Sequence, residues 1–417
     1  MPKEKVYSSD FDFMPNHPAG VLAPKGFKSG ATYCGLKTYG AGKLDLGLLV
    51  SSVPCAAAGV YTQSLVRAAP VLLDSEITGQ GTAQAVIFNA GIANACTGEQ
   101  GYYDAQEMQQ LAGEKLGIPA NYVLVTSTGV IGHMLPMEKI RSGVEAITLG
   151  EGEAAGTQAS FCIMTTDTRP KRAVARFTWD GKVCFIGGMC KGAGMIHPNM
   201  ATMLCYLTTD VAATPAFLQA VLSELAQETF NMITVDGDTS TNDSVLLLAN
   251  GLSGTPVLGD GASPEKEQVF KEALREVMTY LAKEIARDGE GATKLMEVWV
   301  RGAASVKEAR LAVRTVAGSM LTKSAVYGGD PNWGRILAAA GRSGANFDPT
   351  RTDIYIGDVP LMLAGTPQPF EKSQAQAALT GPEVYITVDL HAGEGEAVGW
   401  GCDLTQEYVV INSEYET

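Results

Sequence analysis

The residues with the clearest capacity for chemistry lie in one stretch near the middle of the chain, residues 191–204, which reads KGAGMIHPNMATML. Its glycines permit close backbone approach and its proline fixes φ, so the local backbone is tightly specified. The stretch contains Lys191 and ends near the pair Ala201–Thr202, a small residue followed by a hydroxyl. This arrangement fits self-processing, in which the Thr202 hydroxyl attacks the Ala201 carbonyl, the acyl group shifts to oxygen, and water cleaves the ester.

Cleavage at this bond would free the α-amine of Thr202. An α-amine has a pKa near ~8, against ~10.4 for a lysine side chain, so it can act as a base near neutral pH. Nucleophile and base would then belong to one residue. A Gly/Pro turn leading into a strand at Met203–Leu207 explains the same letters without any chemistry. Both interpretations stay open on this stretch alone.

Composition narrows the functional classes. With 417 residues we expect roughly two or three domains. The net charge of −14 and the lack of a clustered Lys/Arg face argue against nucleic-acid binding. The chain has no G-x-x-x-x-G-K-[ST] motif and no G-x-G-x-x-G after a strand, so we expect neither ATP nor NAD. Without an apolar leader or a membrane-length stretch, we expect a cytoplasmic protein.

Cysteine and histidine usage predicts reduced thiols and no metal centre. The eight cysteines are scattered and include no C-x-x-C pair, which is typical of buried free thiols in a chain of this size. The four histidines are far apart, and none has the spacing of metal ligands. The same scatter argues against a histidine-based catalytic triad.

Helical and strand patterns alternate along the chain, which predicts an α/β or α+β fold. Expected strands lie in 85–98, before a small-residue turn, in 122–132, in two arms around a hairpin at Asp180–Gly181, in 203–210 and in the apolar end of 234–251. Expected helices begin at Asp104, at Thr214–Pro215 and at Ser263–Pro264, and the last of these ends at Asp288–Gly289, just before Glu290. A strand-rich smaller unit follows, with strands at 296–302, 352–363, 383–390 and 407–413 and a helix after the turn at 328–335.

Several separated motifs now allow comparison with a known family. They are NACTG (94–98), TSTGVIG (126–132), TTDTRPK (165–171), the central stretch, DGDTSTND (236–243), DGEGATK (288–294) and the C-terminal CDLTQEYVVINSEYET. In this order and over nearly the whole chain, they resemble the ornithine acetyltransferase family of arginine biosynthesis, also called bifunctional glutamate N-acetyltransferase. Agreement at this many ordered places is specific, and it favours self-processing over the plain turn.

The resemblance implies an αββα sandwich similar to that of N-terminal-nucleophile hydrolases, spanning 1–287, and a smaller α/β C-terminal domain, 288–417. It also implies that the precursor cuts itself between Ala201 and Thr202, giving an α chain (1–201) and a β chain (202–417). Two such pairs are expected to form an α2β2 heterotetramer.

The implied activity is ping-pong acetyl transfer. Thr202 would accept acetyl from N2-acetyl-L-ornithine as an ester and pass it to L-glutamate. One amide forms as another breaks, so the exchange is roughly thermoneutral and we expect no cofactor. Whether acetyl-CoA serves as a second donor is left open. One alternative is a self-processing aminopeptidase or amidase of the related fold, with water as acceptor, and another is a non-enzymatic binding protein.

The resemblance also places site residues on this sequence. The oxyanion hole falls on Thr128 and Gly129, in the Ser/Thr/Gly turn that ends the stretch 122–132. The substrate contacts fall on Thr165 (with Thr166 as the alternative), Lys191, Thr202, Glu290, Asn412 and Thr417. The two substrates differ in side-chain charge, and Lys191 with Glu290 supply one cation and one anion, although the group that each meets stays open. His197 is not expected to be the base, because the Thr202 amine makes it unnecessary.

Two positions depart from the family pattern. Glu416 stands where many relatives have arginine, which reverses a charge beside Thr417. Ile92 replaces a residue that is usually small or polar, so we expect a reshaped wall near the site. Neither position is part of the expected nucleophile or oxyanion turn.

Overall fold

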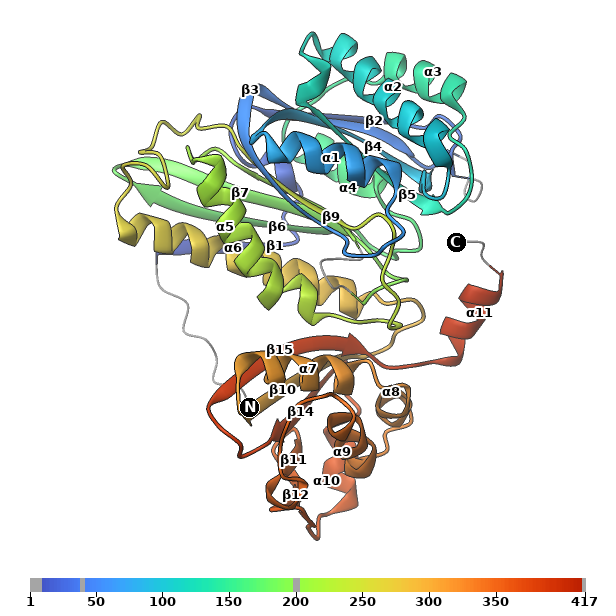
Figure 1. Ribbon diagram of the computed structural model, residues 1–417, viewed down its shortest axis with the longest axis vertical. Helices are drawn as coiled ribbons and strands as arrows, with labels where there is room; N and C mark the ends of the chain where they lie inside the picture. Colours follow the sequence, from blue (N-terminus) through green and yellow to red (C-terminus); the bar gives the residue numbers. More distant parts are fainter. Residues whose placement is uncertain (1–9, 38–41, 198–202, 415–417) are drawn as a thin grey trace.

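The computed structural model describes residues 10–37, 42–197 and 203–414, and these form two β-sheets flanked by helices (Figure 1). The larger sheet has nine strands in the order β1-β6-β7-β8-β9-β3-β4-β5, with β2 added beside β3. Its strands are β1 Phe11–Pro15, β2 Phe27–Thr32, β3 Leu46–Tyr61, β4 Thr82–Ile92, β5 Val123–Val130, β6 Lys171–Trp179, β7 Lys182–Lys191, β8 Leu204–Thr209 and β9 Ser244–Ala249.

The smaller sheet has six strands in the order β13-β12-β11-β14-β10-β15. Its strands are β10 Leu295–Ala303, β11 Asp353–Ile356, β12 Val359–Leu363, β13 Thr366–Pro367, β14 Glu383–Asp389 and β15 Gly395–Cys402. The α-helices are α1 Ala69–Gly79, α2 Gly98–Leu116, α3 Met137–Ala146, α4 Gly152–Cys162, α5 Pro215–Glu228, α6 Pro264–Arg287, α7 Val306–Ala317, α8 Met320–Tyr327, α9 Trp333–Gly341, α10 Lys372–Ala377 and α11 Gln406–Glu414. Short 3-10 turns are η1 Gly20–Leu22, η2 Ala120–Tyr122, η3 Phe230–Met232 and η4 Pro349–Arg351.

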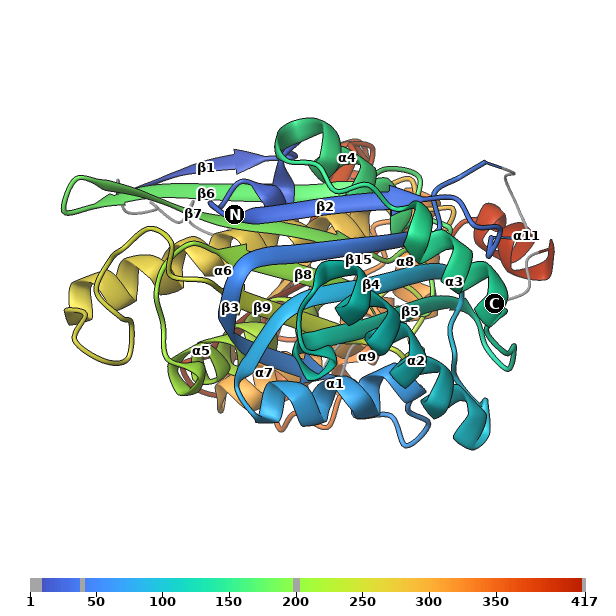
Figure 2. The ribbon, with the colours of Figure 1, turned by 90° about the horizontal axis from the view of Figure 1, so that it is seen from above.

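The larger sheet bends through the long strand β3 and so packs against itself. The first part of β3 pairs with β2 and β4, its last part pairs with β9, and the register shifts between Val50 and Cys55. Figure 2 shows the curve of β3 at this bend. One half of the sheet therefore lies over the other, with α2 and α3 outside the first half and α5 and α6 outside the second (Figure 1). This is the αββα arrangement that the resemblance implied.

Alternating residues of β8 show the two sides of its half of the sheet. Tyr206 faces the other half, where its ring lies 5.6 Å from that of Phe88 and its hydroxyl is hydrogen-bonded to Thr126 at 2.5 Å. Its neighbours Cys205 and Leu207 belong instead to the cluster that packs on α5 and α6. Both sides of β8 are buried, which explains why the strand reads as an almost continuous apolar run.

Most expected elements are present. The hairpin at Asp180–Gly181 joins β6 and β7, and both turn residues have positive φ (50° and 76°), as a type I′ turn requires. Thr214 caps α5 by accepting a hydrogen bond from the Phe217 N–H at 3.2 Å. The longest helix is α6, which begins at Pro264 and ends at Arg287, so that Asp288 and Glu290 follow directly.

Two of the predicted secondary-structure assignments were wrong. Asp104 does not cap a helix, because α2 already begins at Gly98 and Asp104 lies within it, accepting a hydrogen bond from Gln100 at 2.8 Å. The segment 407–413 is not a strand but belongs to helix α11. Its β-branched residues favour a strand, yet the segment pairs with none of the described strands, and Thr405 accepts a bond from the Tyr408 N–H at 3.4 Å in the manner of an N-cap.

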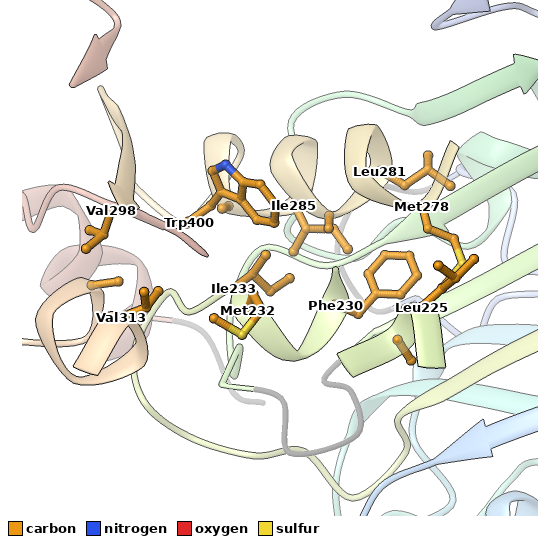
Figure 3. Close-up of a cluster of buried hydrophobic side chains, with 14 of the residues drawn as sticks. Leu225, Phe230, Met232, Ile233, Met278, Leu281, Ile285, Val298, Val313 and Trp400 are labelled. Carbon is orange, nitrogen blue, oxygen red and sulfur yellow. The ribbon is translucent and has the colours of Figure 1, made fainter. Parts of the chain in front are cut away.

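The predicted division at 287/288 falls at the end of α6, and β10 to β15 all follow it. An apolar cluster joins the two sheets at this point. Figure 3 shows its side chains extending from α6 and η3 to Trp400 of β15. Within it, the Thr234 N–H donates to the Trp400 carbonyl at 2.9 Å. No helix among the described residues is long and apolar enough to cross a membrane.

Replacement of Phe230 should test this joint. Phe230 is fully buried in the cluster, so Phe230→Ala removes a large side chain from a packed site and should lower the free energy of unfolding by about 3–5 kcal/mol. Chemical denaturation of both proteins measures the difference. Phe161→Ala is the matched control, because Phe161 is 47% exposed and its loss should cost less than about 0.5 kcal/mol. Equal effects of the two replacements would contradict the packing described here.

Candidate active site

A cleft of about 500 Å³ opens where β5 and β7 end, β8 begins and α11 approaches. All expected site residues that the structure describes line this cleft. They are Thr128, Gly129, Thr165, the alternative Thr166, Lys191, Glu290 and Asn412. These residues come from five separate segments of the chain, so the structure brings them together although the sequence does not. Their individual roles stay predictions.

The expected nucleophile and cleavage site, Ala201 and Thr202, lie outside the described residues, as does Thr417. The described residues on either side of the junction do line the cleft. Met195 lies before it and Met203 after it. In the sheet, Lys191 at the end of β7 pairs with Leu204 at the start of β8, so the central stretch leaves and re-enters the sheet at one place.

Thr128 and Gly129 lie near the end of β5, against an irregularity in β4. Gly129 has a φ of +130°, and a Cβ there would lie 2.2 Å from the carbonyl carbon of Gly91. Only glycine fits this contact between two backbones. Ile92 pairs with Thr128 in the sheet but packs against the buried cluster of β3–β5. It is not among the described residues that line the cleft, so the expected change to a cleft wall is not seen there.

Lys191 is almost completely buried, with 8% of its surface exposed. Its Nζ donates a hydrogen bond to the Thr128 hydroxyl oxygen at 3.2 Å. Burial lowers the pKa of Lys191 from its usual value, and the nearby Asp167 carboxylate opposes that change. A cation that is only partly hydrated therefore lies directly beside the expected oxyanion turn.

Glu290 lies opposite, just after α6. Its N–H donates to the Ala193 carbonyl at 2.9 Å, and its Oε2 accepts a hydrogen bond from Asn412 at 2.8 Å. Gly194 passes close by, since a Cβ there would lie 2.3 Å from a Glu290 carboxylate oxygen. The helix α11 thus contributes directly to the cleft through Asn412, whereas the sequence predicted a strand for this segment.

Sequence reasoning missed Asp236, which shapes the loop before the junction. Its two carboxylate oxygens accept hydrogen bonds from the N–H groups of Met195 and Ile196, at 2.7 and 2.8 Å. Met195 has a φ of +55°, an uncommon conformation for a residue with a side chain. Asp236 is the first residue of the motif DGDTSTND. An acidic residue in a polar turn often binds backbone N–H groups, but no spacing rule connects Asp236 to residue 195.

A second missed residue, Asn242, belongs to the same motif. Its side-chain amide donates to the carbonyls of Ala93 and Ser127, at 2.6 and 2.8 Å. It therefore fixes the backbone directly before Thr128 to the segment after β4. The polar turn before β9 and the expected oxyanion turn consequently form one hydrogen-bonded unit.

His197 is not among the described residues that line the cleft. Its Nδ1 lies 3.0 Å from the Thr234 hydroxyl. Burial, with a smaller effect of Arg314, lowers its pKa to about 4, so the ring is neutral at neutral pH. Among the residues that the structure describes, no group of three His, Cys, Asp or Glu side chains could bind a metal ion.

Comparisons with known proteins agree with the motif pattern. The model of the ArgJ family matches residues 28–417. The chain belongs to the ArgJ family. A relative named arginine biosynthesis bifunctional protein ArgJ, from Symbiobacterium thermophilum, is 55% identical over 398 residues, which cover 95% of this chain and 98% of the relative. Another of the same name, from Dehalococcoides mccartyi, is 47% identical over 409 residues, covering 98% and 100%. The resemblance drawn from the motifs is thus confirmed.

Among solved structures, an arginine biosynthesis bifunctional protein ArgJ from Bacillus halodurans matches this ArgJ-family chain with a TM-score of 0.49 and 46% identity, covering 50% of this chain and 98% of that chain. An ornithine acetyltransferase from Mycobacterium tuberculosis, complexed with ornithine, matches with a TM-score of 0.43 and 38% identity, covering 46% and 100%.

The glycine at the expected oxyanion turn yields a stability prediction. In Gly129→Ala the added Cβ meets the Gly91 backbone, which cannot rotate away, and the positive φ alone costs about 1–3 kcal/mol. We expect a clear fall in melting temperature. Gly79→Ala is the control, since a Cβ at Gly79 meets nothing within 4 Å. If the two variants melt alike, the close contact between β4 and β5 is not as described.

Proposed function

We propose that this chain is a self-processed acetyltransferase. It moves acetyl from N2-acetyl-L-ornithine to L-glutamate in a ping-pong reaction through an ester on Thr202, giving L-ornithine and N-acetyl-L-glutamate. One observation carries the proposal: Thr128, Lys191 and Glu290 converge on a single cleft that both described flanks of the Ala201–Thr202 junction also line. Membership of a family whose relatives are named for arginine biosynthesis supports it.

In the proposed reaction the precursor first cuts itself at Ala201–Thr202. The freed Thr202 amine then takes the proton from its own hydroxyl, which attacks the acetyl carbonyl. The tetrahedral intermediate carries an oxyanion, and we assign its stabilisation to Thr128 and Gly129. Each well-aimed donor of this kind is worth about 3 kcal/mol of barrier. Departure of the ornithine amine leaves the acetyl ester, which the glutamate amine attacks in the second half of the reaction.

The charges of the cleft suit two amino acids that differ in the charge of their side chains. Lys191 offers a cation near Thr128, and Glu290 offers an anion whose position depends on Asn412.

We also propose that the enzyme uses no cofactor, that its α and β chains form an α2β2 heterotetramer, and that it is cytoplasmic. The word bifunctional in the relatives' names favours acetyl-CoA as a second donor to glutamate. An assay with acetyl-CoA and glutamate tests this directly.

The proposed self-cleavage can be tested on the purified protein. Denaturing electrophoresis of the purified protein should show two fragments, whereas Thr202→Ala should leave one intact chain because the attacking hydroxyl is absent. Thr208→Ala is the matched control: Thr208 is a buried threonine of β8 whose hydroxyl donates to the Val21 carbonyl at 2.7 Å, and its replacement should leave cleavage unchanged. An uncut wild-type chain that transfers acetyl normally would contradict the mechanism.

The products formed from N-acetylornithine distinguish acetyl transfer from hydrolysis, the alternative activity. With N-acetylornithine alone we expect little acetate, and with added glutamate we expect N-acetylglutamate to form together with ornithine. Chromatography of both products measures the partition. A hydrolase would release acetate at one rate with or without glutamate, because water would reach the ester as readily as the amine does.

A further inference from the structure

A buried lysine outside the expected substrate contacts lies between two carboxylates. Lys171, at the start of β6, is 1% exposed, and its Nζ lies 2.6 Å from Asp167 and 2.6 Å from Asp288. Buried charges of this kind persist only when they are paired and hydrogen-bonded. The three side chains form one cluster directly behind the cleft, and the proposed reaction has so far used none of them.

Asp167 contacts two cleft segments besides Lys171. Its Oδ2 accepts a hydrogen bond from the Thr165 N–H at 3.0 Å, and its Oδ1 accepts one from the Gly192 N–H at 2.7 Å. Gly192 follows Lys191 directly and has a φ of +154°. One carboxylate therefore fixes both the Thr165 turn and the backbone at the end of β7, from which the Lys191 side chain reaches Thr128.

Asp288 extends the cluster to the opposite wall. It follows the last residue of α6, and it accepts hydrogen bonds from both the N–H and the hydroxyl of Thr168. Glu290 lies two residues further along the chain. Through Lys171, the turn that carries Thr165 is thus tied to the segment that carries Glu290.

Asp167 lies between two buried cations, because Lys191 acts on its carboxylate in addition to Lys171. The ionisable groups that face Lys191 are Asp167, Lys171, Glu290 and Asp243, and the Thr128 hydroxyl is its hydrogen-bond acceptor. Burial lowers the pKa of Lys191, whereas Asp167 is the strongest influence that raises it. Burial alone would also raise the pKa of Asp167, but Lys171, Lys191 and the Gly192 N–H keep it well below its usual range.

We propose that Asp167 is a positioning residue for acetyl transfer: its carboxylate fixes Thr165 and Gly192 around the cleft, and its negative charge offsets the buried Lys191 ammonium beside Thr128. Lys171 is the counter-ion that allows the Asp167 carboxylate to be buried. This inference rests on the proposed acetyl transfer. It goes further by assigning the charge of a substrate-contacting lysine to a residue that does not touch substrate.

The pH dependence follows from these charges. Transfer needs a neutral Thr202 amine and a charged Lys191, so kcat/KM for the acetyl donor is lost as pH falls through the pKa of the amine. It is lost again as pH rises through the pKa of Lys191. Without the Asp167 charge the protonated form of Lys191 is less stable. The fall of kcat/KM at high pH, the basic limb of the profile, therefore moves to lower pH.

The experiment compares Asp167→Asn with Asp167→Glu. In Asp167→Asn we expect the basic limb of kcat/KM for N-acetylornithine to move down by about one to three pH units, the usual effect of losing a nearby opposite charge. Asp167→Glu keeps the charge and should keep the limb near its wild-type position. Asp210→Asn is the matched control: Asp210 is fully buried and accepts bonds from the Phe185 and Lys25 N–H groups, away from the cleft, and its replacement should leave the limb unmoved.

A second readout does not depend on turnover. Competitive labelling with isotopic acetic anhydride, followed by mass spectrometry, reports the protonation of the Lys191 amine in the free protein at each pH. We expect the Lys191 labelling curve to move down in Asp167→Asn and up in Lys171→Gln, because the latter removes a like charge that faces Lys191.

Unmoved labelling and unmoved limbs in Asp167→Asn, with only a uniform loss of rate, would overturn the inference and leave Asp167 a purely structural residue. If the wild-type protein transfers no acetyl, the proposed function fails instead, and the labelling curves still decide whether Asp167 sets the charge of Lys191. Should Asp167→Asn fail to fold, Asp167→Glu provides the deciding measurement, because a retained charge should keep the Lys191 labelling curve near its wild-type position, whereas a curve that moves down in this variant would contradict the inference.

Discussion

The cleft depends on the burial of charges that balance one another. Lys171 lies between Asp167 and Asp288 at 2.6 Å from each, in a region from which water is excluded. Such pairs add little net stability, because the loss of hydration offsets most of the Coulomb attraction, yet the loss of one partner is costly. These ion pairs therefore act mainly by fixing the relative positions of the segments that carry them. The turn before β6 and the end of α6 have one low-energy arrangement relative to each other, and Glu290 is carried into position with them.

The same principle extends to the loop before the cleavage junction. Asp236 accepts hydrogen bonds from Met195 and Ile196, and Asn242 binds the backbone before Thr128. Each polar side chain satisfies backbone groups that would otherwise be buried without a partner. The cleft is thus surrounded by irregular backbone whose shape is determined by side chains rather than by strand or helix geometry. Such a shape suits a site in which one carbonyl must be presented to one hydroxyl.

Features with a local cause could be predicted from the sequence, and features with a tertiary cause could not. The hairpin at Asp180–Gly181 and the cap at Thr214 depend on residues within a few positions, and both are present. The motifs also gave candidate site residues that the structure brings to one cleft, because ordered agreement with a family requires no knowledge of contacts. The prediction of a strand at 407–413 was wrong because pairing with a sheet is decided by the whole fold, and this segment forms helix α11 instead. The pairing of Lys171 with Asp288 was missed for a similar reason, since 117 residues separate them.

The sheet also explains how a cut chain could remain one molecule. In the proposed processing, β7 would belong to the α chain and β8 to the β chain, yet these strands are hydrogen-bonded neighbours from Ile186–Thr209 to Lys191–Leu204. Tyr206 of β8 packs against Phe88 of β4, and Lys171 pairs with Asp288 across the same division. Separation of the two chains would expose the core between the halves of the sheet and leave buried charges without partners. Cleavage can therefore free the Thr202 amine without loosening the cleft that it is proposed to serve.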